Sequence, residues 1–124
     1  MRTMTITLYG ITNCDTVKRA RAWLTEHELA YVFHDFKKQG VPQPQLDHWL
    51  VELGWEAVLN RRGTSWRRLD ETARADVVDA ASARAALLAN PSLIKRPVVD
   101  WGGATGLSVG FDAQQWTAYA GVKD

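Results

Sequence analysis

A strand that leads directly into a helix, with the only cysteine of the chain at the junction, is the feature that most constrains the fold. Thr5 to Tyr9 alternate polar and apolar side chains, which predicts a strand that Gly10 ends. From Val17 onward the apolar residues follow a helical period. Cys14 therefore falls near a helix N-terminus, where free N–H groups and the helix dipole favour a thiolate. The sequence predicts Cys14 as the first candidate for chemistry.

Length and composition predict one soluble domain over residues 1–124, because 46% of the chain is apolar and 23% is charged. Fifteen basic residues oppose fourteen acidic ones, so the net charge of +1 favours neither nucleic acids nor membrane surfaces as partners. One cysteine cannot form an internal disulfide, and no signal peptide or long apolar span is present. We expect a cytoplasmic protein. No metal is expected, because neither His34 nor His48 has a second ligand at metal spacing.

The remaining pattern predicts three further blocks. Residues 30–36 form a second strand, which completes a parallel β-α-β unit before a loop at 37–41. A helical block at about 42–90 follows, with a first helix that Gly54 ends and later helices at 70–80 and 82–89, the last capped by Ser82. The final block is a hairpin of strands 97–100 and 105–109, joined by a turn at 101–104, and a helix that Asp112 caps.

A basic cluster lies inside the helical block. Residues 60–68 contain Arg61, Arg62, Arg67, Arg68 and Trp66. Such a cluster can bind a phosphate, an oxyanion or single-stranded nucleic acid. Alternatively it is a solvated loop whose arginines pair with the acidic residues at 70, 71 and 76. Because the composition shows no broader basic surface, a small anion is favoured over a polynucleotide.

Four stretches of the chain resemble the blocks of one family. They are residues 8–20 around Cys14, 59–67 in the basic cluster, 91–99 before the hairpin, and 109–111. Together they are similar to the arsenate-reductase-like family (ArsC/Spx/YffB), and most similar to its YffB-like subgroup. The resemblance implies an α/β thioredoxin-like fold, β-α-β followed by β-β-α, with a central helical insertion at about 42–90.

The resemblance also implies roles for individual residues. Cys14 corresponds to the nucleophile, and Arg96 with Arg62, or alternatively Arg61, corresponds to the arginines around the thiolate and oxyanion. Pro97 corresponds to the cis-proline that faces the cysteine, which fits the small cost of a cis bond before proline. Backbone groups of Thr12 and Asn13 would stabilise developing charge. Lys18, one turn after Cys14, would help to hold a thiolate or an anion, or else belongs to a solvated face.

Two departures from the family pattern bear on the activity. True arsenate reductases have a third arginine just before the last helix, and residues 106–111 contain none. Spx-like regulators often have a second cysteine where this chain has Val17, so an intramolecular disulfide switch is excluded.

The resemblance therefore implies a thiol reductase whose Cys14 forms a mixed disulfide or adduct that glutathione resolves, with no tightly bound cofactor. The alternatives are an Spx-like regulator that binds RNA polymerase and an arsenate reductase proper. The expected partners are glutathione or another small thiol and a protein disulfide or oxyanion substrate. Neither a nucleic acid nor a membrane is expected, and we expect a monomer.

Overall fold

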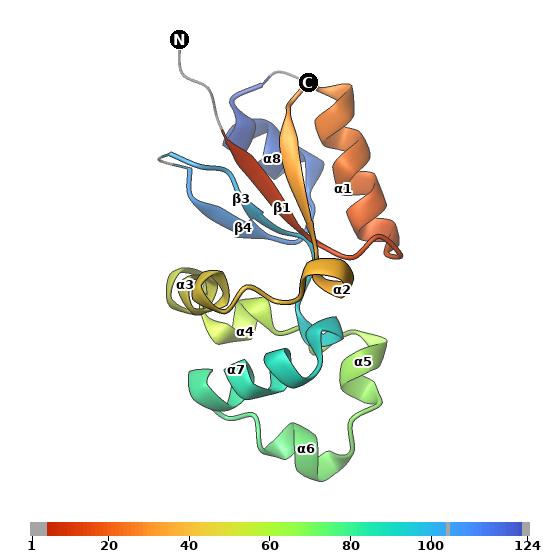
Figure 1. Cartoon of the computed structure of the whole chain (residues 1–124), viewed down its shortest axis with the longest axis vertical. Helices are drawn as coiled ribbons and strands as arrows, with labels where there is room; N and C mark the ends of the chain where they lie inside the picture. The colour runs from red at the N-terminus through yellow and green to blue at the C-terminus, as the bar shows by residue number, and fades with distance from the viewer. Residues whose placement is uncertain (1–4, 104, 123–124) are drawn as a thin grey trace. The chain divides into compact units, whose positions relative to one another are not determined.

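A computed structural model of the chain describes residues 5–103 and 105–122 (Figure 1). Ala104, part of the predicted turn at 101–104, lies outside the described residues. Contacts between residues divide the chain into two compact units. The first combines the stretch up to Gly40 with the stretch from Arg96 onward, and the second is Val41–Lys95. The predicted helical insertion at about 42–90 falls within this second unit.

The first unit begins with the predicted β-α-β arrangement. Strand β1 (Ile6–Gly10) is followed by helix α1 (Asp15–Glu26) and strand β2 (Tyr31–Asp35). The two strands are parallel, with Ile6 paired to Tyr31 and Gly10 to Asp35. A short helix, α2 (Phe36–Gln39), then completes this half of the unit.

The second half of the first unit is an antiparallel hairpin and a helix. Strand β3 (Val98–Asp100) pairs with β1, and strand β4 (Leu107–Val109) pairs with β3. Helix α8 (Ala113–Ala120) follows and is capped by Asp112, whose side chain accepts the N–H of Gln115. The four-stranded sheet has the order β2-β1-β3-β4. The predicted thioredoxin-like order of strands and helices is therefore confirmed for the described residues.

One face of this sheet carries the core of the first unit. Ile6 and Leu8 of β1 point to the same face, because strand residues two apart share a side. Helices α1 and α8 cover that face, and their contact is aromatic: Trp23 of α1 and Trp116 of α8 meet edge to face at 5.6 Å between ring centroids. Trp101 meets Trp116 in the same way at 4.9 Å. Edge-to-face pairs of this kind add to the stabilisation from burial.

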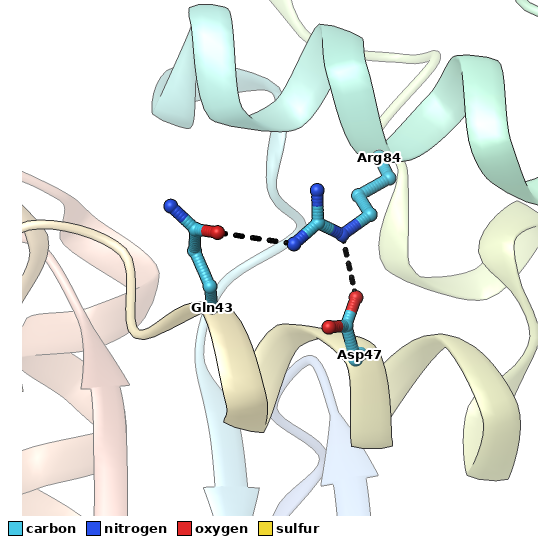
Figure 2. A network of polar contacts seen from close by, with 3 residues as sticks. All are labelled: Gln43, Asp47 and Arg84. Carbon is cyan, nitrogen blue, oxygen red and sulfur yellow. Dashed lines mark hydrogen bonds and ion pairs between the residues drawn. The ribbon is translucent and has the colours of Figure 1, made fainter.

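The second unit is helical. Its elements are α3 (Gln43–Leu53), α4 (Trp55–Val58), α5 (Thr64–Arg67), α6 (Glu71–Ala75), α7 (Ala80–Ala89) and the 3-10 helix η1 (Pro91–Leu93). An isolated bridge joins Leu59 to Ile94. Figure 2 shows a polar contact between two of the helices, in which Arg84 of α7 donates to Asp47 of α3 at 2.6 Å and to Gln43 at 3.1 Å. Gly54 ends α3 as predicted, with a positive φ of 86°.

The secondary structure differs from the prediction in two stretches, and in each of them a side-chain cap sets the start of a helix. The predicted strand at 30–36 ends at Asp35, and the predicted loop at 37–41 opens with α2. The Asp35 carboxylate accepts the N–H of Lys37 at 2.9 Å, while the Asp35 N–H donates to the Gln39 side chain at 3.1 Å. This reciprocal capping starts the helix directly at the end of the strand.

The second difference is the cap of the helix at 82–89. The predicted helix at 70–80 already ends at Ala75, and α7 begins at Ala80 with Asp79 as its N-cap. Ser82 is the third residue of that helix. Its N–H donates to Asp79 at 2.9 Å and its hydroxyl accepts the Asp79 N–H at 3.0 Å, so the two side chains form a capping box.

No helix in the described part of the chain is long and apolar enough to cross a membrane.

Candidate active site

Cys14 lies where β1 leads into α1, as the sequence predicts. It is the N-cap of α1, with extended backbone angles (φ −151°, ψ 119°), and its carbonyl accepts the N–H of Lys18 at 2.9 Å. Its side chain makes no capping hydrogen bond, so the helix N-terminus does not engage the sulfur as a cap. Cys14 is half-buried and packs against the core of the first unit. A thiol at this place meets the free N–H groups and the positive end of a twelve-residue helix.

The other predicted binding residues of this junction are exposed. Thr12 and Asn13 lie in the bend that precedes Cys14, and Lys18 lies one turn into α1. All three positions are therefore open to a ligand that approaches the cysteine along the helix N-terminus. Their roles in binding stay predictions.

The Arg96–Pro97 segment belongs to the same unit and lies beside the end of β1. The peptide bond between Arg96 and Pro97 is cis, as the sequence predicts. Tyr9 pairs with Val98, so the antiparallel register continued by one residue sets Pro97 opposite Gly10, four residues before Cys14. The Pro97 carbonyl accepts the N–H of Gly110 at 2.9 Å, which ties the segment to the end of β4. Pro97 is buried and Arg96 is half-buried.

Arg61 and Arg62 belong to the second unit, in the turn between α4 and α5, and the structure distinguishes them. The Arg61 guanidinium lies 3.7 Å from the Glu56 carboxylate and 5.7 Å from the ring centre of Trp55. Its charge is therefore already matched by an acid and an aromatic face. The guanidinium of Arg62 has no hydrogen-bond or ion-pair partner within Val41–Lys95. Of the two alternatives left open by the sequence, the geometry favours Arg62 for an anion.

The rest of the basic cluster does not follow the predicted pairing with acids. Arg67 donates to the carbonyl of Arg62 at 2.6 Å, and Arg74 donates to the carbonyls of Arg67 and Leu69. Asp70, one of the expected partners, caps α6 by accepting the N–H of Ala73 at 2.7 Å. The partners of Arg67 and Arg74 are thus backbone carbonyls, and not the carboxylates that the sequence predicts.

Sequence reasoning did not identify the residues that hold the Arg62 turn. Asn60 accepts the N–H of Arg62 at 3.0 Å, and Arg67 binds the carbonyl of Arg62. The first contact had a signal in the sequence, because an asparagine two residues before the residue it binds, with a glycine next, is typical of an Asx-turn. The second contact had none, since it depends on how α5 folds back on the turn.

Two other features bear on possible ligands. Trp101 is fully buried in the core, where its indole N–H donates to Ser108 at 2.9 Å, so it is not open to a ligand. Trp66 is half-buried. Within residues 5–103 and 105–122, no group of three or more His, Cys, Asp or Glu side chains is placed to hold a metal ion.

Comparison with known proteins agrees with this arrangement. The sequence model of the ArsC family matches residues 9–119, which include Cys14, the basic cluster and the Arg96–Pro97 segment. The chain belongs to the ArsC family.

Individual proteins also match most of this ArsC-family chain. The solved structure of a YffB protein is 49% identical, with a TM-score of 0.85, and the match covers 93% of this chain and 98% of that one. An uncharacterised protein of Haemophilus influenzae is 38% identical over 91% of this chain and 96% of its own length. The global transcriptional regulator Spx of Streptococcus agalactiae is 29% identical over 76% of this chain and 69% of its own length.

Proposed function

We propose that this ArsC-family protein is a glutathione-dependent thiol reductase in which Cys14 is the nucleophile. The observation that carries the proposal is the place of Cys14: the thiol is half-buried at the N-terminus of α1 and uninvolved in capping, and it follows by four residues the end of β1 that the register sets opposite Pro97 of the cis Arg96–Pro97 bond. Membership of an arsenate-reductase-like family supports thiol chemistry at this position.

The reaction begins with attack of the Cys14 thiolate on one sulfur of a disulfide substrate. A Cys14–substrate disulfide forms, the substrate S–S bond breaks, and the second sulfur leaves as a thiolate. A glutathione thiolate then attacks the substrate's sulfur or Cys14, and a second glutathione completes the exchange. The net result is one disulfide reduced to two thiols and two glutathione molecules oxidised to glutathione disulfide, with the Cys14 thiolate restored. We propose that a monomer does this in the cytoplasm, where glutathione is available.

Two arginines are proposed to assist this exchange. Arg96 precedes the cis proline at the end of β1 and would stabilise the thiolate that forms and leaves. Arg62, whose guanidinium lacks a partner in its own unit, would bind an anionic group of the substrate or of glutathione, whose carboxylates suit a guanidinium. Thr12, Asn13 and Lys18 border the same end of α1 and are proposed as further contacts.

A disulfide suits this site better than arsenate does. In the stretch before α8, where a third arginine would add charge for an oxyanion, the chain has Gly110 and Phe111. Phe111 packs on the core, with its ring 4.7 Å from that of Trp116. The stretch thus supplies an apolar ring where an oxyanion would need a cation. Cys14 is the only cysteine of the chain and Val17 stands at the position of a second one, so the thiol that resolves Cys14 has to come from another molecule.

The test is the reaction of Cys14 with oxidised glutathione, followed by mass spectrometry of the intact protein and by the rate at which added glutathione removes the adduct. We expect one glutathione per chain, complete reversal by glutathione, and no adduct in Cys14→Ser. Arg62→Ala and Arg96→Ala should slow adduct formation by about tenfold each, the effect of one lost charge-assisted contact. Lys95→Ala is the matched control, because Lys95 is an exposed cation next to Arg96 and should react within about twofold of the wild type.

Failure to form the adduct, or an adduct that glutathione does not remove, would refute the reductase. Reduction of arsenate at a rate comparable to that of a disulfide would instead favour the arsenate-reductase alternative. An equal effect of Lys95→Ala and Arg96→Ala would show that net charge alone, and not the place of Arg96, accounts for the rate.

A further inference from the structure

We propose that Arg67 is a positioning residue that fixes the backbone of the Arg62 turn and so directs the Arg62 guanidinium toward an anionic substrate. This inference rests on the role proposed above for Arg62. It adds a residue that does not itself touch the substrate.

The turn is held at both sides of Arg62. Its N–H donates to the Asn60 side chain at 3.0 Å, and its carbonyl accepts from the Arg67 guanidinium at 2.6 Å. The bond from Arg67 is short and charge-assisted, which places it among the stronger hydrogen bonds. Both contacts use the backbone of Arg62, so its side chain is left available within Val41–Lys95. Because the backbone of Arg62 is already fixed, less conformational entropy is lost when its side chain binds a ligand.

Gly63 shows how closely this turn is packed. A Cβ atom at Gly63 would lie 2.7 Å from the amide nitrogen of Asn60. If that amide moved away, its oxygen would lose the hydrogen bond that it accepts from the Arg62 N–H. The absence of a side chain at Gly63 therefore leaves room for the Asn60 contact.

Arg67 is held in its turn by the next helix. Arg74 of α6 donates to the carbonyl of Arg67 at 3.2 Å and to that of Leu69. Helix α5, which ends at Arg67, is thereby tied to α6 (Figure 1 labels both). Because the acceptors of Arg67 and Arg74 are neutral carbonyls, these bonds do not cancel either positive charge.

Arg61 has the opposite arrangement. Its guanidinium is matched by Glu56 and lies over the Trp55 ring. Two adjacent arginines therefore differ in what surrounds them, and the difference follows from the turn, which sends one side chain toward α4 and leaves the other open.

The experiment compares two reagents that attack the same thiol. Oxidised glutathione is anionic, so under the role proposed above for Arg62 its reaction with Cys14 should depend on that side chain, whereas iodoacetamide is neutral. We expect Arg67→Ala to slow the reaction with oxidised glutathione by about threefold to tenfold, as for loss of one hydrogen bond, and to leave alkylation by iodoacetamide within about twofold. Arg68→Ala is the matched control: it removes an exposed cation from the next position and should change both rates by less than about twofold.

A double-mutant cycle separates positioning from a general effect on the fold or charge. If Arg67 acts through Arg62, adding Arg67→Ala to Arg62→Ala changes the glutathione reaction no further. Asn60→Ala loosens the same turn from its other side and should give the same pattern, which keeps the test decisive if Arg67→Ala folds poorly. Far-UV circular dichroism and urea unfolding verify that each variant is folded.

Three results would overturn the inference. These are an equal slowing by Arg67→Ala and Arg68→Ala, full additivity of Arg62→Ala and Arg67→Ala, and equal losses with the anionic and neutral reagents. If Arg62→Ala slows the anionic reaction but Arg67→Ala does not, the inference fails and the proposed role of Arg62 stands. If Arg62→Ala itself has no effect, both fail.

Discussion

Gly10, the last residue of β1, limits how closely α1 can pack against the sheet beneath Cys14. An alanine Cβ at this position would lie 2.9 Å from Cγ2 and 3.5 Å from Cγ1 of Val17, a residue with 0% exposure in the core. Overpacking of this kind costs about 1–3 kcal/mol. Replacing glycine in a strand also restricts the unfolded chain, which stabilises by about 0.4–1 kcal/mol. We therefore expect Gly10→Ala to lower the free energy of unfolding by about 1–2 kcal/mol.

The effect of Gly10→Ala on the free energy of unfolding should change sign when Val17 is replaced by alanine. Val17→Ala alone leaves a cavity and costs about 1–3 kcal/mol. It also removes both Cγ atoms, and the remaining Val17 Cβ is 3.8 Å from the added methyl group, an ordinary contact. In the Val17→Ala background, Gly10→Ala should then stabilise the protein by about 0.4–1 kcal/mol.

Urea unfolding of the four proteins, followed by tryptophan fluorescence, measures all three differences. The alkylation rate of Cys14 by iodoacetamide should change with Gly10→Ala and return toward the wild-type value in the double variant, because the clash displaces the start of α1. A stabilising Gly10→Ala, or the same cost in both backgrounds, would contradict the packing argument.

Three further predictions concern stability. Trp101→Phe removes the indole N–H that donates to the buried Ser108 hydroxyl, and it should lower the free energy of unfolding in urea by about 1–3 kcal/mol. If this effect is local, the losses from Trp101→Phe and Gly10→Ala should add in the double variant. Burial, and then the charge of Asp100, raise the pKa of Tyr9 above its ordinary value of 10.0. The neutral phenol therefore contributes fully to the free energy of unfolding below pH 10.0, and this contribution is lost as the pH rises through the folded-state pKa. The free energy of unfolding should fall on alkaline titration, and it should fall less steeply in Tyr9→Phe. Hydrogen bonds from the backbone N–H and then from the hydroxyl of Ser82 lower the pKa of Asp79 below 3.8. Asp79→Ala should therefore destabilise the protein at neutral pH. The difference in thermal unfolding between this variant and the wild type should shrink as the pH falls below about 4.

The order of strands and helices in the first unit could be predicted because each signal was local and agreed with its neighbours. The period change between Leu8 and Val17 defines β1 and α1, and the Arg-Pro sequence at 96–97 admits a cis bond at small cost. Helix starts were less predictable, because Asp79 and Ser82 are both good caps and only their mutual hydrogen bonds decide between them. The same competition occurs at Asp35, where the side chain of Gln39, four residues further along, accepts the Asp35 N–H and helps to turn the end of a strand into the start of a helix.

The basic cluster illustrates what a sequence leaves open about charge. Four arginines within nine residues predict either an anion site or a solvated surface, and the sequence of the cluster is equally consistent with both. The fold assigns the side chains different tasks: Arg61 is matched by Glu56, while Arg67 binds a carbonyl and holds the turn. Within their own unit, only the guanidinium groups of Arg62 and Arg68 have no partner, and of these two it is Arg62 whose N–H and carbonyl are both held by side chains. Anion recognition in such a cluster depends less on the number of cations than on which one the others hold in place. For this reason the double-mutant cycle of Arg62 and Arg67 is more informative than any single charge removal.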